Sequence, residues 1–403
     1  MPGVLFVGAG REQRSAIVRA RERGYRVVAV DDDPGAEGLG HADVAEVADV
    51  ENGSALAELA RRHGVDGVLT VGLDQAATAV ADAAERAGLP SIGPATAHRF
   101  SQVLALRRTL AEEGVPQPAY AAVRSLAEGR AAIDVVGLPA VLKPADADRQ
   151  RGLFRIDEPG DLESHLHASL AESPTHEAVL ESYVDGAEMN AVVVARGGTP
   201  RLVCLSDRLR PPGEGFGVAW AHIHPAAIHS DQLAAAERLA ERTVSVLGLR
   251  DGIALVQLVA TPDRALSVLG ASVGVPGGRL AELAWHAVGV DLLDLALLFA
   301  LGEEVPDEAM LPRAGQQPVA IRFVTGAPGS LPTGRVARVG ALGPVLSADG
   351  VLDAEVLLAA GDVVRSLRRA DDRHGYVLAT GPTTVEALAN ADDAAGLLVV
   401  EGE

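Results

Sequence analysis

The first hundred residues alternate strand-like and helix-like runs, and this pattern limits the possible folds more than any other feature. "VLFVG" at 4–8 is an apolar run ending in glycine, and "REQRSAIVRARERGY" after it has helical spacing. "RVVAV" at 26–30 is the next strand-like run, and "SALAELARRHG" with "DGVLTVG" repeats the pair. Strands alternating with helices in this order are typical of a parallel sheet with helices on its faces. The sequence therefore predicts an α/β protein that starts with a βαβ unit at residues 1–100.

The loop "GAGREQ" after the first strand has part of a dinucleotide-binding pattern. Gly8 and Gly10 are in place, and three aspartates follow about 20 residues later. The third glycine position holds Gln13, whose side chain would hinder close packing of helix on strand. We therefore expect a structural turn here and no NAD site.

Composition excludes several classes of partner and location. The chain has 403 residues, enough for two or three domains, and a net charge of −20. This charge argues against nucleic acid and anionic membrane partners, because both need a basic surface. The single cysteine, Cys204, excludes an internal disulfide and fits a reducing compartment. The N-terminus lacks the basic segment of a signal peptide, so we expect a cytoplasmic protein.

The pattern of strand-like and helix-like runs changes near residue 101 and again near residue 306. Short strand-like runs with glycine turns follow one helix, and "GIALVQLVA" and "ALSVLGASV" meet at "TPD" as in a β-hairpin. After a proline-rich segment, strand-like runs mix with one helix that Thr383 should cap. We predict three domains, at 1–100, 101–305 and 306–403, with the last of α+β type.

Position 143, within "AVLKPADADRQRGLFRI" at 140–156, carries the only lysine; every other basic position among the 35 lysines and arginines is arginine. Lysine offers a compact point charge on a flexible stem, which arginine does not. Arg149, Arg151 and Gly152 follow it in a loop. A lysine at a strand end followed by a glycine-containing loop favours an anion-binding cradle.

The order of these segments resembles the ATP-grasp superfamily, and most closely its carboxylate–amine ligases, such as the L-amino-acid ligases. "VGAGREQ…RERGYRVVAVDDDP" and "AERAGLPSIGP" resemble the Rossmann-like pre-ATP-grasp domain. "VLKPAD…RGL" and "LESYVDGAE" resemble the nucleotide-clamping strands, and "GDVVRSLRRADDRHGYVLATGPTTVEALANA" resembles the C-terminal ligase domain. The resemblance covers nearly the whole chain and implies an ATP-grasp fold.

The resemblance also implies a chemistry and a set of binding residues. Such ligases activate a carboxylate with ATP and Mg²⁺ as an acyl phosphate, which an amine then attacks; the substrate would be a small carboxylate or an amino-acid-like molecule, and a homodimer is common. Lys143 would contact the phosphates, Glu181 the adenine amine, and Glu188 the ribose hydroxyls. Tyr183 and Val184 would lie on the hinge strand beside adenine. The alternative for the charged residues is ordinary surface charge.

The sequence departs from this family where the metal should bind. A second phosphate lysine is replaced by Val103, and an acidic metal ligand on the first hairpin strand by Gln257. The Glu-x-Asn-x-Arg pattern on the second strand is replaced by Gly270, Ser272 and Gly274. Magnesium needs hard oxygen ligands, usually carboxylates. We therefore predict no metal site, doubtful Mg²⁺ binding and at most weak ATP binding.

Other side chains could still act in such a pocket. Arg149, Arg151 and Arg279 are candidates for binding phosphate or carboxylate, with surface charge as the alternative. His222 and His224 lie two apart on a predicted strand and should face one side. By the resemblance His224 would face the substrate, and a structural pair is the alternative. Without a third ligand in view, zinc is not expected.

Three hypotheses for function follow. The first is a divergent ATP-grasp-like protein of specialised small-molecule metabolism that has lost ordinary Mg·ATP ligation. Its cleft would serve another transformation, with Lys143, His224 and Arg279 as the catalytic candidates. The second is an active carboxylate–amine ligase with unusual metal ligation. The third is a non-catalytic binding or scaffolding partner of a ligase.

Overall fold

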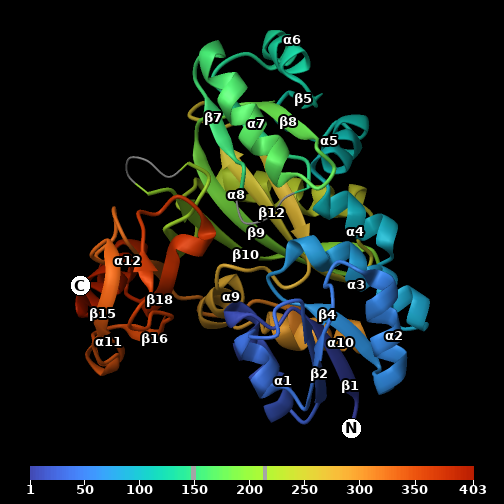
Figure 1. Ribbon diagram of the computed structural model, residues 1–403, viewed down its shortest axis with the longest axis vertical. Coiled ribbons are helices and arrows are strands. Elements are labelled where there is room, and N and C mark those ends of the chain that lie inside the picture. The colour runs from blue at the N-terminus through green and yellow to red at the C-terminus, as the bar shows by residue number, and fades with distance from the viewer. Residues whose placement is uncertain (147–150, 212–215) are drawn as a thin grey trace.

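The computed structural model describes residues 1–146, 151–211 and 216–403, and Arg149 lies outside the described residues. Its N-terminal, central and C-terminal segments occupy different regions around one large sheet (Figure 1). Among the described helices, none is long and apolar enough to cross a bilayer alone. The helices Leu280–Val288 and Leu292–Leu301 are long and apolar enough when taken together, but the chain bends by 111° at the break between them.

The N-terminal region is a parallel sheet with helices on its faces, as the alternating pattern predicted. Its strand order is β3-β2-β1-β4. The strands are β1 (Gly3–Val7), β2 (Arg26–Asp31), β3 (Val44–Val47) and β4 (Gly67–Thr70), and the helices are α1 (Arg11–Glu22), α2 (Gly53–His63), α3 (Ala77–Ala87) and α4 (Pro94–Ser101). Gln13 on α1 is buried, and its amide donates to the Val71 carbonyl at 2.6 Å. The side chain at the third glycine position therefore ties α1 to the end of β4.

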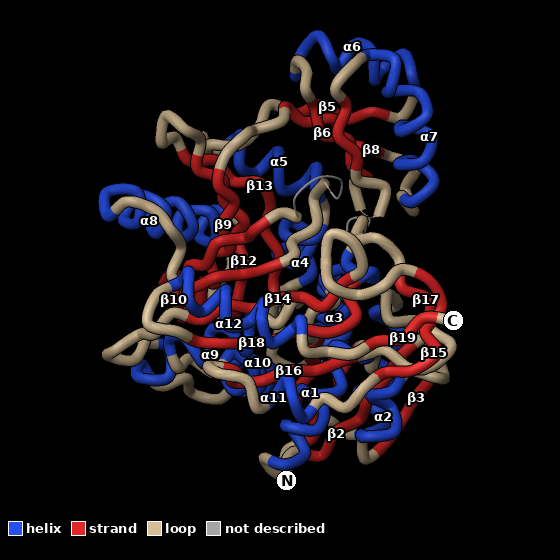
Figure 2. Tube along the Cα trace, turned by 90° about the vertical axis from the view of Figure 1, so that its left-hand side faces the viewer, coloured by secondary structure: helices blue, strands red, loops and turns tan. Residues whose placement is uncertain are grey.

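A small antiparallel sheet projects from the rest of the molecule (Figure 2). Its strand order is β5-β8-β6-β7. The strands are β5 (Tyr120–Val123), β6 (Ala140–Pro144), β7 (Phe154–Ile156) and β8 (Ala178–Ser182), and α6 (Leu126–Val136) and α7 (Leu162–Glu172) pack on it. The preceding helix, α5 (Val103–Glu112), connects it to α4. Val141 on β6 pairs with Glu181 on β8, so Lys143 and Glu181 come from neighbouring strands.

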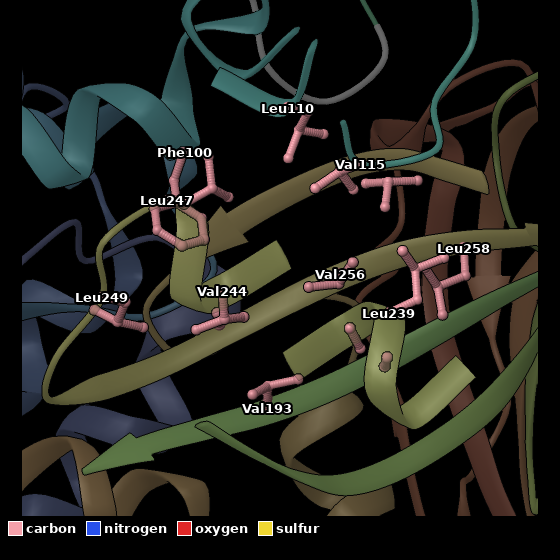
Figure 3. Packing of buried hydrophobic residues seen from close by; sticks show 14 of the residues in the cluster. Phe100, Leu110, Val115, Val193, Leu239, Val244, Leu247, Leu249, Val256 and Leu258 are labelled. Atoms are coloured by element: carbon pink, nitrogen blue, oxygen red, sulfur yellow. The ribbon is translucent and has the colours of Figure 1, made fainter. Parts of the chain in front are cut away.

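The large sheet has eight strands in the order β13-β12-β9-β10-β11-β14-β18-β16. Its members are β9 (Ala187–Arg196), β10 (Thr199–Leu209), β11 (Ala221–His224), β12 (Gly252–Ala260), β13 (Leu266–Val273), β14 (Val319–Thr325), β16 (Val351–Val356) and β18 (Arg373–Thr380). Helix α8 (Ser230–Val246) covers one face, where Val193 and Val256 meet Leu239 and Val244 (Figure 3). Helices α9 (Leu280–Val288) and α10 (Leu292–Leu301) pack on part of the other face. The rest of that second face carries the polar residues of the candidate site.

The C-terminal segment completes the large sheet and adds a smaller one. Strands β15 (Gly334–Val339), β17 (Val363–Val364) and β19 (Val400–Gly402) form the small sheet, and α11 (Gly343–Leu346) and α12 (Thr384–Gly396) lie beside the large one. Thr383 caps α12 by accepting the Glu386 N–H at 3.2 Å, as predicted. The predicted boundary at residue 306 separates strands that share one sheet, and the division into domains stays a prediction.

Candidate active site

A row of polar positions crosses the large sheet where β9, β10, β12 and β13 lie side by side. Gln257 on β12 is paired with Asn190 on β9 and with Gly270 on β13, and Asn190 is also paired with Ser206 on β10. Directly paired residues project from the same face of a sheet. The hairpin predicted at "TPD" is present, and it sets Gln257 opposite Gly270 in this row. Ser272 lies two residues further along β13.

His222 on β11 extends this row through a hydrogen bond rather than through direct strand pairing. Asn190 Nδ2 lies 3.1 Å from His222 Nδ1. Burial, followed by the positive charges of Arg373 and Arg208, lowers the pKa of His222 well below its ordinary value. His222 is therefore a neutral imidazole at this site, with one ring nitrogen that donates and one that accepts.

Arg373, the first residue of β18, reaches this site from the C-terminal segment. Its Nε and Nη2 donate to the Ala219 carbonyl at 3.1 and 2.7 Å, and its guanidinium lies 4.0 Å from the Phe323 ring centroid. Burial, followed by repulsion from Arg208, lowers its pKa to about 10. No carboxylate within the described parts of the chain forms an ion pair with Arg373; Glu12 acts on it at longer range.

His222, Gly278 and Arg373 together form what we call the anion cradle. A Cβ placed on Gly278 would lie 3.5 Å from His222 Nε2 and 3.7 Å from Arg373 Nη1. Gly278 has a φ of +66°, which L side chains rarely adopt. The missing side chain leaves a position that the neutral His222 ring and the Arg373 guanidinium both border. A guanidinium suits a carboxylate or phosphate oxygen.

A second cluster, which we call the nucleotide-side cluster, consists of Arg107, Lys143 and Glu181. Arg107 is fully buried, and its Nε and Nη2 donate to the two Glu181 oxygens at 2.7 and 2.9 Å. Lys143 Nζ lies 3.0 Å from Glu181 Oε2. Arg107 also donates to the carbonyls of Val268 and Leu269, at 2.9 and 2.6 Å. The arginine therefore joins the small sheet to the edge strand of the large sheet.

Burial and the neighbouring charges shift the pKa values of Glu181 and Lys143 in this cluster. Burial alone would raise the pKa of Glu181, but Arg107 and Lys143 outweigh it and lower that pKa below its usual value. Burial lowers the pKa of Lys143, against the attraction of Glu181. The predicted phosphate lysine is thus held by the same carboxylate that was predicted to accept from adenine. Both nucleotide roles stay predictions.

Sequence reasoning missed Arg107, although a signal existed. Val103, at the expected position of the second phosphate lysine, lies one helical turn before Arg107 on α5. Residues four apart share a helix face, so the cationic side chain enters the same region from the next turn. Arg373 and Asn190 were also missed, and only the long-range pairing of strands brings them to the site.

Glu188 and Tyr183, two further residues predicted to contact the nucleotide, interact with other residues of the chain. Glu188 forms ion pairs with Arg208 and, at 3.3 Å, with Arg210. Tyr183 follows β8 at the junction with β9; its N–H donates to the Pro139 carbonyl at 3.0 Å, and Arg155 stacks on its ring. Val184, next to it, is partly buried.

Arg151 and Gly152 begin the loop that leads into β7. Arg151 forms a 3.7 Å contact with Glu172 and is largely exposed. Gly152 has a φ of +66°, and a Cβ there would lie 2.8 Å from Pro144 Cγ. Glycine is therefore required by the turn itself.

The remaining two catalytic candidates lie at different places. Arg279 contacts Glu282 at 3.2 Å and Glu355 at 2.6 Å, and it stacks on Tyr376, so it joins α9 to the C-terminal strands. His224 lies on the same strand face as His222, as expected, and is buried between the Leu205 carbonyl at 2.9 Å and Gln316 at 3.3 Å. Burial lowers the pKa of His224. Their catalytic roles stay predictions.

A magnesium ion does not fit the side chains present. Gln257, Gly270 and Ser272 provide an amide oxygen and a hydroxyl but no carboxylate at the expected positions. Within the described ranges, no group of three or more His, Cys, Asp or Glu residues could hold a metal ion. Arg208 and Arg373 add positive charge close by, which disfavours a divalent cation.

Asp207 and Arg208, adjacent on β10, do not pair with each other. Arg208 pairs with Glu188, whereas Asp207 accepts the Ala227 N–H at 3.0 Å. Burial raises the pKa of Asp207 to about 6 from 3.8. Because the folded-state pKa is above the unfolded value, this group favours folding fully below pH 3.8, and the benefit is lost as the pH rises through about 6.

Asp207→Asn should therefore remove a pH-dependent cost. We expect the variant to exceed the parent protein by about 2–3 kcal/mol in unfolding free energy above pH 6.5, and by only about 0.5 kcal/mol near pH 4. Urea unfolding between pH 4 and pH 8 measures the difference, with exposed Asp134→Asn as the matched control. Parallel profiles for the parent and Asp207→Asn would contradict it.

Comparisons with known proteins agree with this architecture. Residues 330–403 match the family described as L-amino acid ligase C-terminal domain 2. The L-amino acid ligase from Bacillus licheniformis is similar over 100% of this chain and 99% of its own, with a TM-score of 0.83 and 18% identity. A carboxyaminoimidazole ribonucleotide synthase from Aspergillus clavatus, complexed with ATP, is similar over 98% and 97%, with a TM-score of 0.77 and 16% identity.

Sequence relatives point the same way. The formate-dependent phosphoribosylglycinamide formyltransferase of Chlorobaculum tepidum is 25% identical over 79% of this chain and 80% of its own. The carbamoyl phosphate synthase large chain of Pseudothermotoga lettingae is 22% identical, and this chain spans only 27% of its length. The chain therefore has the fold of the ATP-grasp ligases, and its residues 330–403 match the family model of L-amino acid ligase C-terminal domain 2.

Proposed function

We propose that this chain is an ATP-grasp-like protein of small-molecule metabolism that binds an anionic substrate without Mg²⁺ and has lost ordinary Mg·ATP-driven ligation. The observation that carries the proposal is the charge at the site, where neutral side chains and an arginine stand in place of the expected acidic metal ligands. The expected metal positions hold Gln257, Gly270 and Ser272, while Arg373 enters beside His222 without a carboxylate ion-pair partner among the described residues.

The residues predicted to bind the nucleotide support the same proposal. Both oxygens of Glu181 accept from Arg107, and Glu188 is paired with Arg208 and Arg210. ATP would have to compete with these guanidinium groups for the two carboxylates. Phosphoryl transfer also depends on metal ions to offset charge on the phosphates. Losing a single preorganised electrostatic group typically costs about 10²–10³ in rate.

The anion cradle indicates what the site would bind. A carboxylate or phosphate oxygen at Gly278 would accept from the Arg373 guanidinium and, in the His222 tautomer that carries its proton on Nε2, from that N–H as well. A carboxylate or amino-acid-like substrate meets this requirement, and the similar ligase from Bacillus licheniformis is named for L-amino acids. Glu12 lies near the neighbouring glycine, with its Oε2 3.5 Å from a Cβ placed on Gly277.

Arg373→Gln should weaken anion binding about tenfold or more, since a charge-assisted hydrogen bond is lost. Calorimetry with inorganic phosphate in the presence of EDTA measures it. Exposed Arg201→Gln, on β10, is the matched control and should bind phosphate as the parent does.

The competing function is an active carboxylate–amine ligase, which the retained Lys143 and Glu181 favour. It predicts that ADP with Mg²⁺ raises the melting temperature while ADP with EDTA does not. Our proposal predicts equal melting temperatures in the two conditions. A magnesium-dependent rise would refute it.

A further inference from the structure

A cavity of about 1080 Å³ lies at the seam between the N-terminal sheet and the large sheet. It is bordered by the ends of β4, β12 and β13, by α3 and α10, and by the loop at 302–308. It includes no residue of the anion cradle or of the nucleotide-side cluster. Its volume slightly exceeds the usual range for pockets that hold drug-sized ligands, about 300–1,000 Å³.

Small apolar side chains line the walls of this cavity. Helix α3 contributes Ala77, Ala81 and Ala84, and α10 contributes Ala296 and Ala300. The cavity opens to solvent, and the alanines of α3 are buried at its base. Their short side chains leave room that a ligand could fill. Two of the walls, β4 and α10, are in close contact with each other, because a Cβ placed on Gly67 of β4 would lie only 2.5 Å from the Ala300 carbonyl of α10.

The rim of the cavity is acidic. Five carboxylates border it against a single guanidinium, that of Arg196: Asp251, Glu303, Glu304, Asp307 and Glu308. Arg196 is already engaged by Asp307 and by the Val305 carbonyl. Glu303, Glu304 and Glu308 are exposed, and none of them forms an ion pair with a described residue. The rim therefore presents uncompensated negative charge above an apolar interior.

We infer that this cavity is a second ligand site and that it binds an amphiphilic amine. The apolar body would fill the space between α3 and α10, and the ammonium group would lie among the rim carboxylates. Burying apolar surface supplies the affinity, at about 25 cal/mol per Å² before the costs of binding. The carboxylates select against fatty acids and other anions. This inference is independent of the proposed function, because it concerns different residues and a ligand of opposite charge.

The test is calorimetric titration with n-decylamine below its micelle concentration. We expect saturable one-to-one binding, and at least tenfold weaker binding of decanoate, which has the same chain length and the opposite charge. Butylamine, which keeps the charge and lacks the apolar body, should not bind measurably.

Two kinds of variant locate the site. Ala81→Leu and, separately, Ala296→Leu should each weaken decylamine binding at least tenfold by filling the cavity; exposed Ala171→Leu on α7 is the control. Glu303→Gln with Glu304→Gln should weaken it about fivefold, more at low salt, as expected for exposed charges. The adjacent exposed acids Glu112 and Glu113, changed to glutamine, are the control.

Several outcomes would overturn the inference. Unchanged decylamine affinity in both leucine variants would place binding elsewhere, and equal affinity for decanoate would remove the role of the rim. A dimer that decylamine dissociates in sedimentation experiments would show that a second copy of the chain occupies the cavity. Absence of decylamine binding to a folded parent protein would refute the inference outright.

Discussion

Arg107→Ala will lower the free energy of unfolding by about 3–5 kcal/mol, the range for a broken buried ion pair. Arg107 is fully buried and binds both Glu181 oxygens and two main-chain carbonyls. Alanine would leave the Glu181 carboxylate with Lys143 alone and would leave the carbonyls of Val268 and Leu269 without this donor. Urea unfolding at pH 7 measures the loss.

Arg108→Ala is the matched control for this prediction. Arg108 is the next residue on α5 and is exposed, so its removal should change stability by no more than about 0.5 kcal/mol. A triple variant, Arg107→Met with Lys143→Met and Glu181→Leu, keeps the test valid if the single variant does not fold. It removes all three charges of the cluster and should be more stable than Arg107→Ala, because no uncompensated charge stays buried. Equal free energies of unfolding for Arg107→Ala and Arg108→Ala would show that the cluster does not stabilise the fold.

Restoring acidic ligands will restore metal-dependent nucleotide binding. The variant with Gln257→Glu, Gly270→Glu and Ser272→Asn places two carboxylates and one amide on the paired strands β12 and β13. A Cβ on Gly270 would meet only the Gln257 side-chain oxygen, at 3.3 Å, so the longer side chain can be accommodated. We expect Mn²⁺ to tighten ADP binding by about tenfold in this variant and not in the parent.

Two features keep this gain modest. Arg208 and Arg373 still repel a divalent cation, and Val103 still occupies the position expected for the second phosphate lysine. A variant with Gly270→Gln, Ser272→Asn and the native Gln257 is the matched control, since it has similar side-chain volume and no added charge. Metal-dependent tightening in this control would show that charge at these positions is not what the parent lacks.

Local sequence patterns predicted much of the fold. Periodicity over ten to fifteen residues located the strands and helices of the N-terminal sheet, and the turn at "TPD" fixed the hairpin of β12 and β13. The lone lysine drew attention to Lys143, which does contact Glu181. These features depend on neighbours in sequence or on segments whose pairing a turn enforces.

The site itself depends on contacts that local patterns do not contain. Arg107 and Glu181 are 74 positions apart, and Arg373 reaches His222 only because β18 and β11 flank β14 in one sheet. Arg279 was predicted as a substrate residue from its neighbouring glycines; that role stays a prediction, and the ion pairs of its guanidinium with Glu282 and Glu355 were not predicted. Buried charges find partners wherever the fold brings them together, and spacing along the chain does not reveal those partners.

The site should hold an anion without a divalent cation. Crystals of the parent protein soaked with ADP and Mn²⁺ test this expectation most directly, because manganese is located by its anomalous scattering. We expect no ordered manganese beside Gln257, Gly270 or Ser272, and we expect phosphate density between His222 and Arg373 in crystals soaked with phosphate alone. An ordered manganese ion held by protein carboxylates at those positions would show that the metal site is intact.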